Sequence, residues 1–295
     1  MKSIKTVAKD DGPKLINYTQ YNTLEVNEIV KKINDFIDED IPDEDITTNL
    51  TVNDNILIQA DIVAMDDMIF AGEQIIPHCF NANIEVYKND GDKLQPNDII
   101  GTIKGDAKSI LSRERVMLNI IQRLSGIATH TKKYVDLANP FNVKILDTRK
   151  TTPGMRMFEK YAVKCGGGYN HRFSLSDGIL IKDNHIESAG SIENVLENID
   201  KQYWIELEVD TIDQIKQALS YNINGFLLDN MHREKIIECV QVIRSHPMGD
   251  NIFIEASGGI NLMNITPYLD TGIDGISIGA LTHQINSCDI KLEFK

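Results

Sequence analysis

The sequence has no run of about 18 consecutive apolar residues, the length that a helix needs to cross a bilayer, so we expect no membrane partner. Cysteine is scarce as well. The four cysteines lie far apart and form no Cys-x-x-Cys pair, so neither a zinc motif nor a redox motif is indicated. Residues 1–11 lack the apolar core of a secretory signal peptide, and we expect a cytoplasmic protein with reduced thiols.

Positive charge is also in short supply. The chain has 30 Lys and Arg residues against 44 Asp and Glu residues, a net charge of −14. Nucleic-acid backbones are bound by clustered Lys and Arg, so we expect no nucleic-acid partner. Residues 147–183, here called the cationic segment, reverse this balance. The segment has seven basic residues against four acidic ones: Arg149, Lys150, Arg156, Lys160, Lys164, Arg172 and Lys182. It fits either a helix face balanced by acidic neighbours or a pocket that attracts a small polyanion.

The length of 295 residues favours two domains. Residues 1–22 are polar and lack periodicity, so we expect them to form a mobile extension, with folding beginning near Thr23. Residues 26–37 have helical spacing of apolar residues, and residues 56–64, 83–87 and 99–103 resemble short strands. A long helix is predicted over residues 112–134, with Ser112 as its cap. We place a small α/β domain at residues 23–117 and a larger domain at 118–295, whose extreme C-terminus we expect to pack against the small domain.

The second half of the chain alternates short apolar strands with helical stretches. The predicted strands are residues 143–147, 178–182, 203–209, 225–229, 251–256 and 275–279. Several are nearly continuous apolar runs, as expected of parallel strands buried on both faces. The pattern fits an incomplete α/β barrel and also a doubly wound sheet.

Each predicted strand ends in a residue that is able to do chemistry. These ends are residues 147–150, Lys182, Glu208, Asp229, Ser257 and Gly279. In a parallel barrel they share one rim, where active sites lie. The glycine-containing turns at 257–259 and 277–279 suit a phosphate, because backbone N–H groups can approach the anion closely; a simple strand-to-helix turn is the other interpretation.

Glu208 and Asp229 end neighbouring predicted strands. Two carboxylates on one rim suit a hydrated magnesium ion or the hydroxyls of a ribose. They also fit ion pairs with Lys182 and Arg172. A lysine on a barrel strand is able to form a Schiff base, but the acids near Lys182 favour a charged ammonium and therefore an ionic contact.

Several ordered motifs resemble those of quinolinate phosphoribosyltransferases. They are EDIPDEDITT (39–48), ERVMLNIIQRLSGIAT (114–129), LDTRKTTPGMR (146–156), KCGGGYNHR (164–172), LIKDNH (180–185) and EASGGI (255–260). The resemblance implies an N-terminal α/β sandwich and an open α/β barrel of about seven strands. It also implies magnesium as cofactor and a homodimer with shared active sites. The implied reaction joins quinolinate to phosphoribosyl pyrophosphate with decarboxylation, giving nicotinate mononucleotide for NAD biosynthesis.

The resemblance also implies roles for individual residues. Catalytic roles fall to Lys150, Lys182, Glu208 and Asp229. Quinolinate and the pyrophosphate group would be surrounded by Thr148, Arg149, Lys150, His171, Arg172 and Lys182, with Arg115 reaching in from the other subunit. Glu208 and Asp229 would hold the ribose and magnesium, and Ser257, Gly258, Gly259 and Gly279 the 5′-phosphate. A phosphoribosyltransferase for another pyridine acid and a non-catalytic phosphoribosyl-binding regulator remain as alternatives.

Overall fold

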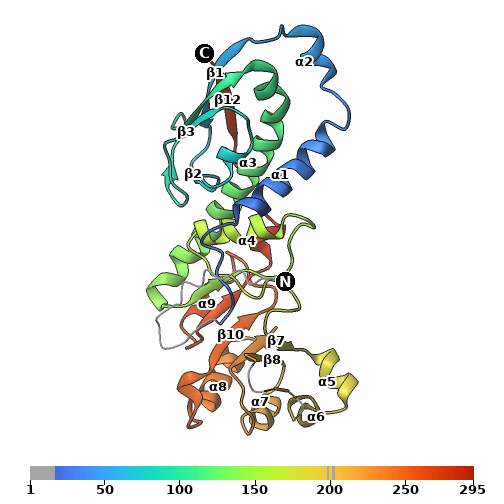
Figure 1. Ribbon diagram of the computed structural model, residues 1–295. Helices are drawn as coiled ribbons and strands as arrows, with labels where there is room; N and C mark the ends of the chain where they lie inside the picture. The colour runs from blue at the N-terminus through green and yellow to red at the C-terminus, as the bar shows by residue number, and fades with distance from the viewer. Residues whose placement is uncertain (1–16, 198, 201–202) are drawn as a thin grey trace. The chain divides into compact units, whose positions relative to one another are not determined.

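The computed structural model describes residues 17–197, 199–200 and 203–295 (Figure 1). These residues form two compact units. The barrel unit contains described residues 17–20, 133–156 and 168–283, and the sandwich unit contains residues 21–132, 157–167 and 284–295. The predicted boundary at residues 117–118 lies inside one continuous helix, α3 (Ala107–Ala138). No helix in the described ranges is long and apolar enough to span a membrane.

The sandwich unit is built on an antiparallel sheet in the order β12-β1-β5-β3. Its strands are β1 (Leu57–Ala64), β3 (Asn83–Val86), β5 (Ile99–Asp106) and β12 (Ile290–Phe294). The last strand of the chain, β12, pairs with β1 (Figure 1). A second, two-stranded ladder joins β2 (Met68–Ile69) to β4 (Lys93–Leu94), and η1 (Ile76–His78) lies between them in the sequence.

The helices of the sandwich unit follow the apolar spacing of the sequence in most places. Helix α1 (Val26–Asp40) buries Ile29, Ile33 and Ile37, which recur every four residues and so share one face. Helix α2 (Ile46–Thr51) begins at Asp45, whose carboxylate accepts a hydrogen bond from the backbone N–H of Thr48 at 2.9 Å.

The start of α3 differs from the prediction. The helix begins at Ala107, five residues before the expected start, and Ser112 is not its cap. The Oγ of Ser112 instead donates to the carbonyl of Lys108 at 2.8 Å, within the helix. The capping acceptor is Asp106, which binds the N–H of Ser109 at 3.0 Å. Serine satisfies its hydroxyl in either place, so its presence alone did not locate the helix end.

The barrel unit contains a parallel sheet in the order β6-β11-β10-β9-β8-β7. Its strands are β6 (Lys144–Leu146), β7 (Ile179–Ile181), β8 (Ile205–Val209), β9 (Gly225–Asp229), β10 (Phe253–Ser257) and β11 (Gly275–Ser277). The expected open α/β arrangement is confirmed, and its sheet has six strands within the described ranges where about seven were expected. Beside β6 lies an isolated bridge between Leu146 and Tyr169, and the backbone N–H groups of Asp147 and Tyr169 donate across it to the carbonyls of Tyr169 and Ile145.

Helices connect the strands of the barrel unit. They are η2 (Asn139–Phe141), α4 (Arg156–Cys165, mostly in the sandwich unit), α5 (Asp183–Ala189), α6 (Ile192–Leu196), α7 (Ile212–Ala218), α8 (Arg233–Arg244), η3 (Gly249–Asn251), α9 (Thr266–Leu269) and α10 (Ala280–His283). Helices α5 to α8 pack in chain order, each against the next, and α7 contacts β8 (Figure 1). Because all six strands are parallel, this β-α repetition brings their carboxyl ends to one side.

The described part of the expected polar extension does not behave as an extension. Tyr18 and Gln20 are buried in the barrel unit, with 5% and 9% of their surfaces exposed. Tyr18 belongs to a core cluster with Leu146 and Phe253. The expectation that folding begins near Thr23 was therefore wrong for these residues, and residues 1–16 lie outside the described ranges.

Candidate active site

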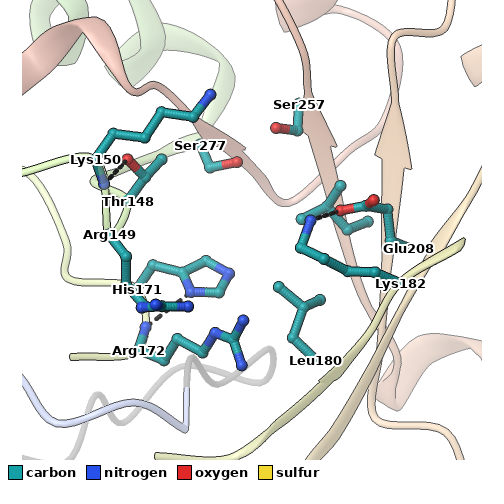
Figure 2. A pocket seen from close by; sticks show the side chains of 11 residues that line it. Thr148, Arg149, Lys150, His171, Arg172, Leu180, Lys182, Glu208, Ser257 and Ser277 are labelled. Carbon is teal, nitrogen blue, oxygen red and sulfur yellow. Dashed lines mark hydrogen bonds and ion pairs between the residues drawn. The ribbon is translucent and has the colours of Figure 1, made fainter. Parts of the chain in front are cut away.

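A pocket of about 350 Å³ opens at the carboxyl ends of the barrel strands, within the size range of small-molecule sites (Figure 2). It is lined by Thr148, Arg149, Lys150, His171, Arg172, Leu180, Lys182, Glu208, Leu227, Ser257 and Ser277. Five of the six strands, and the loop that follows the sixth, contribute side chains. The sheet therefore curves around one site.

Four cationic side chains face one carboxylate in this lining. Lys182 forms an ion pair with Glu208. Arg149, Lys150 and Arg172 have no ion-pair partner within the described ranges. The pocket thus keeps three positive charges available for a ligand.

The loop after β6 positions two of these cations. The N–H of Lys150 donates to Thr148 Oγ1 at 3.0 Å, which turns the chain so that Arg149 and Lys150 reach the pocket. The hydroxyl of Thr282 donates to the carbonyl of Lys150 at 2.8 Å and ties this loop to α10. The loop conformation is therefore held independently of any ligand.

Burial and repulsion between guanidinium groups both disfavour the positive charge of Arg149. Burial, followed by the positive charges of Arg172 and Arg156, lowers the pKa of Arg149. The Nε of Arg149 is buried and has no hydrogen-bond acceptor in the part of the chain that the structure describes. An anion in the pocket would supply that acceptor and reduce the repulsion.

Glu208 and Asp229 lie on adjacent strands and on the same face. Glu208 is in register with Leu227, and Asp229 follows two residues later on the same strand. Burial raises the pKa of Glu208; the Lys182 ammonium lowers it, and the charges of Asp229 and Asp183 raise it again. Two carboxylates close enough to influence one another are the donor type that Mg²⁺ prefers, so this pair fits a magnesium ion.

The turn after β10 brings backbone close to the pocket rim. Ser257 lines the pocket, and Gly258 and Gly259 follow with φ of +97° and +61°. A Cβ on Gly258 would lie 2.2 Å from Asn230 Oδ1, so only glycine fits there. A Cβ on Gly279 would lie 2.9 Å from Lys150 Cδ, which puts the second glycine turn beside a pocket cation.

Two buried carboxylates lie close to the imidazole ring of His171. The Nε2 of His171 lies 3.2 Å from Glu206 Oε2 and 3.8 Å from Glu255 Oε1. Both carboxylates are almost fully buried. Burial, and next the charge of Glu206, raises the pKa of Glu255 to about 8. Burial beside Glu206 therefore favours the protonated form of Glu255, while Glu206 Oε2 accepts a hydrogen bond from the Tyr18 hydroxyl.

Most of the residues named from the sequence come together. Eight of them line the pocket: Thr148, Arg149, Lys150, His171, Arg172, Lys182, Glu208 and Ser257. Asp229, Gly258, Gly259 and Gly279 adjoin it at strand ends but do not line it. Arg115 is exposed on α3 in the sandwich unit, so its role in a neighbouring subunit stays a prediction.

Several site residues were not singled out from the sequence. Leu180 and Leu227 line the pocket, and Glu255 lies close to His171 of the lining. Ser277, which begins the predicted glycine-containing turn at 277–279, lines the pocket as well. The alternation of side chains along a strand carried a signal for these positions, because Glu255 lies two residues before Ser257 and shares its face. No comparable signal marked Tyr18 or Gln20, which lie in a polar stretch.

Both halves of the chain are similar in sequence to known proteins. Residues 45–125 match the family model for the N-terminal domain of quinolinate phosphoribosyl transferase, and residues 127–293 match the model for its C-terminal domain. A Bacillus subtilis protein named probable nicotinate-nucleotide pyrophosphorylase (carboxylating) is 41% identical over 275 residues, covering 90% of this chain and 93% of the relative. A Methanothermobacter thermautotrophicus protein of the same name is 38% identical, covering 89% and 98%.

A solved structure extends the similarity to three dimensions. The nicotinate-nucleotide pyrophosphorylase from Francisella tularensis superposes with a TM-score of 0.88 at 36% identity, covering 95% of this chain and all of the other. The family matches, the sequence identity and the shared structure all cover nearly the whole chain. This protein therefore belongs to the quinolinate phosphoribosyl transferase family.

Proposed function

We propose that this protein transfers the phosphoribosyl group of phosphoribosyl pyrophosphate to quinolinate and releases pyrophosphate and CO2. The product would be nicotinate mononucleotide, a precursor of NAD. One observation carries the proposal beyond family membership: Arg149, Lys150 and Arg172 line one pocket without an ion-pair partner in the described part of the chain. Such a pocket is suited to anionic substrates.

The charges of the substrates match this pocket. Quinolinate has two carboxylates, and phosphoribosyl pyrophosphate carries a pyrophosphate and a 5′-phosphate. Arginine binds a carboxylate with both arms of its planar guanidinium, so Arg149 and Arg172 suit the dicarboxylate. Lys150 and Lys182 would contact the pyrophosphate as point charges. Ser257, Gly258, Gly259 and Gly279 would bind the 5′-phosphate through hydroxyl and backbone N–H groups.

The proposed chemistry requires no protein nucleophile. The ring nitrogen of quinolinate forms a bond to C1 of the ribose while the bond from C1 to the pyrophosphate oxygen breaks. The positive ring nitrogen then stabilises the electron pair left on the ring when CO2 departs, and that carbon takes up a proton. The protein contributes by holding the two substrates in contact and by stabilising the charge of the leaving pyrophosphate.

Magnesium is the proposed cofactor. Glu208 and Asp229 would hold it together with substrate phosphates and water, and the ion would neutralise pyrophosphate charge. Glu208 would then share its charge between the metal and Lys182. We also propose a homodimer in which Arg115 of each chain serves the other chain's pocket.

A steady-state assay tests the proposed reaction. The protein is given phosphoribosyl pyrophosphate, magnesium, and either quinolinate or nicotinate, and mononucleotide formation is followed by chromatography. Quinolinate labelled at the carboxylate next to the ring nitrogen reports CO2 release. We expect one CO2 for each mononucleotide formed, and little product from nicotinate.

A matched pair of lysine variants tests the pocket assignment. Lys182→Ala removes a pocket cation, whereas Lys216→Ala removes an exposed lysine in a surface ion pair outside the pocket lining. Activity should be lost in the first and retained in the second. Preference for nicotinate would favour the alternative pyridine-acid enzyme, and phosphoribosyl pyrophosphate binding without turnover would favour the regulator.

A further inference from the structure

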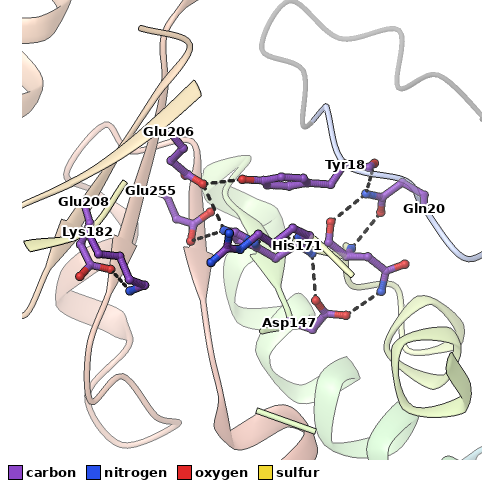
Figure 3. A network of polar contacts seen from close by, with 10 residues as sticks. Tyr18, Gln20, Asp147, His171, Lys182, Glu206, Glu208 and Glu255 are labelled. Atoms are coloured by element: carbon purple, nitrogen blue, oxygen red, sulfur yellow. Dashed lines mark hydrogen bonds and ion pairs between the residues drawn. The ribbon is translucent and has the colours of Figure 1, made fainter. Parts of the chain in front are cut away.

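Residues 17–20 reach the inside of the barrel unit, although they precede its first strand by more than 120 residues. Tyr18 and Gln20 alternate with more exposed neighbours and are both buried. Neither lines the pocket. Both contact the short segment Asn170–Arg172, whose last two residues do line it (Figure 3).

Gln20 pairs with the backbone of Asn170 in both directions. Its Nε2 donates to the carbonyl of Asn170 at 2.9 Å, and its Oε1 accepts from the N–H of Asn170 at 2.9 Å. On the other side, Asp147 accepts from Asn170 Nδ2 at 2.7 Å and from the N–H of His171 at 2.9 Å. The segment that leads to His171 and Arg172 is thus held between Gln20 and Asp147.

Tyr18 holds the side chain of His171 directly. The two rings are stacked, with centroids 4.4 Å apart and an interplanar angle of 27°. The Tyr18 hydroxyl donates to Glu206 Oε2 at 2.8 Å, the same oxygen that lies 3.2 Å from His171 Nε2. Tyr18 and His171 are therefore aligned by one buried carboxylate oxygen (Figure 3).

These contacts also select the protonation form of His171. The N–H of Arg172 donates to His171 Nδ1 at 2.8 Å, so Nδ1 is an acceptor and the ring proton lies on Nε2. That proton is directed at Glu206. His171, Glu206 and Glu255 are also near enough to one another to surround a metal ion. A protonated Nε2 is unable to be a ligand, so the arrangement favours a hydrogen-bonded network.

We propose that Tyr18 and Gln20 are positioning residues of the active site, which hold His171 in its Nε2-protonated form and orient Arg172 toward the anionic substrate. This inference rests on the proposed function, because it assigns the His171–Arg172 pair to quinolinate. The Arg172 guanidinium has no hydrogen-bond acceptor within the described ranges, so its backbone anchorage determines where it points.

A purely structural role for Tyr18 is the competing explanation, because its ring also packs edge-on against Trp204. The centroids of these two rings lie 4.9 Å apart. Substitutions that remove polar atoms and keep volume separate the two. Tyr18→Phe retains both ring contacts and loses only the hydroxyl, and Gln20→Leu loses both hydrogen bonds to Asn170. Tyr161→Phe is the matched control: its hydroxyl also donates to a carboxylate, that of the partly buried Asp90, but in the sandwich unit.

The measurements are kcat, the KM for each substrate, and thermal stability. We expect Tyr18→Phe to raise the KM for quinolinate about threefold to tenfold, and Gln20→Leu to raise it more, because two hydrogen bonds are lost instead of one. The KM for phosphoribosyl pyrophosphate should stay within about twofold of wild type, as should kcat. The control should lose stability without a selective effect on quinolinate.

Nitrogen NMR of histidine-labelled protein gives a readout that does not depend on turnover. The His171 signals, assigned through His171→Gln, should report a single tautomer in wild type and in Tyr161→Phe. In Tyr18→Phe and Gln20→Leu they should report a mixture. If wild-type protein shows one His171 tautomer but does not turn over quinolinate, the proposed function is wrong and the hydrogen-bonded network around His171 still stands.

The proposal is overturned if Tyr18→Phe lowers thermal stability while both KM values and the His171 tautomer remain those of wild type. It is also overturned if the two KM values rise equally. Should Gln20→Leu fail to fold, Tyr18→Phe decides alone, because it keeps the volume and stacking of the ring.

Discussion

Replacing Glu255 by glutamine should change how the stability of the barrel unit depends on pH. The pKa of Glu255 is raised from 4.5 to about 8, first by burial and then by the charge of Glu206; Asp147 raises it further, and His171 and a hydrogen bond from Ser277 lower it. Between these values the folded protein holds a proton that the unfolded chain releases. The contribution of Glu255 to the free energy of unfolding is therefore fully present below about pH 4.5 and is lost as the pH rises toward 8.

The size of this effect follows from the linkage between protonation and folding. Each pH unit inside the window costs somewhat more than about 1 kcal/mol for one carboxyl group, so raising the pH from 5.5 to 7.5 should cost wild type roughly 2–3 kcal/mol. Glutamine resembles the protonated carboxyl and does not titrate. Relative to wild type, Glu255→Gln should thus gain about 2–3 kcal/mol over this range, or roughly 5–10 °C in melting temperature.

Urea unfolding at pH 5.5, 6.5 and 7.5 measures this difference. Trp204 is the only tryptophan in the sequence and packs against the Tyr18 cluster, so its fluorescence reports on the barrel unit. Asp274→Asn is the control, since Asp274 is a buried acid of the same unit paired with Arg244. It should be less stable than wild type by at least about 1 kcal/mol at all three pH values.

A constant difference between Glu255→Gln and wild type at the three pH values would refute this reasoning. It would mean that Glu255 does not change protonation on unfolding, and that the buried pair carries two negative charges in the folded protein. The network around His171 would then need a further positive charge to balance the pair.

Three further predictions concern the pocket. Arg149→Ala and Lys182→Ala should each lower kcat/KM by at least about a hundredfold with little change in melting temperature; wild-type kinetics in either would return that residue to an ordinary surface role. Glu208→Gln and Asp229→Asn should weaken phosphoribosyl pyrophosphate binding and raise the magnesium requirement in calorimetric titrations, while quinolinate binding alone is unchanged. Because Lys182 is 41% exposed, a merely structural Glu208 ion pair predicts a stability loss of only about 0–1 kcal/mol and normal ligand binding. Mixing Arg115→Ala with Lys182→Ala protein under exchange conditions should restore part of the activity, and inactive mixed dimers would contradict the shared site.

The sequence by itself determined the architecture and most of the pocket. Buried parallel strands are short apolar runs, and each ends where the chain meets solvent, so both the strands and their polar ends are visible in the residue order. This local relation is why Lys182, Glu208 and Ser257 were found from strand ends. The ordered motifs then indicated the family.

The tertiary structure decided what depends on partners distant in the chain. Tyr18 and Gln20 lie in a polar stretch with no periodicity, and their burial follows from contacts with Glu206 and Asn170, more than 140 residues away. The protonation of Glu255 likewise depends on Glu206, which a different strand carries. Such interactions leave no local pattern, because hydrogen bonding and desolvation depend on distance in space and not on spacing along the chain.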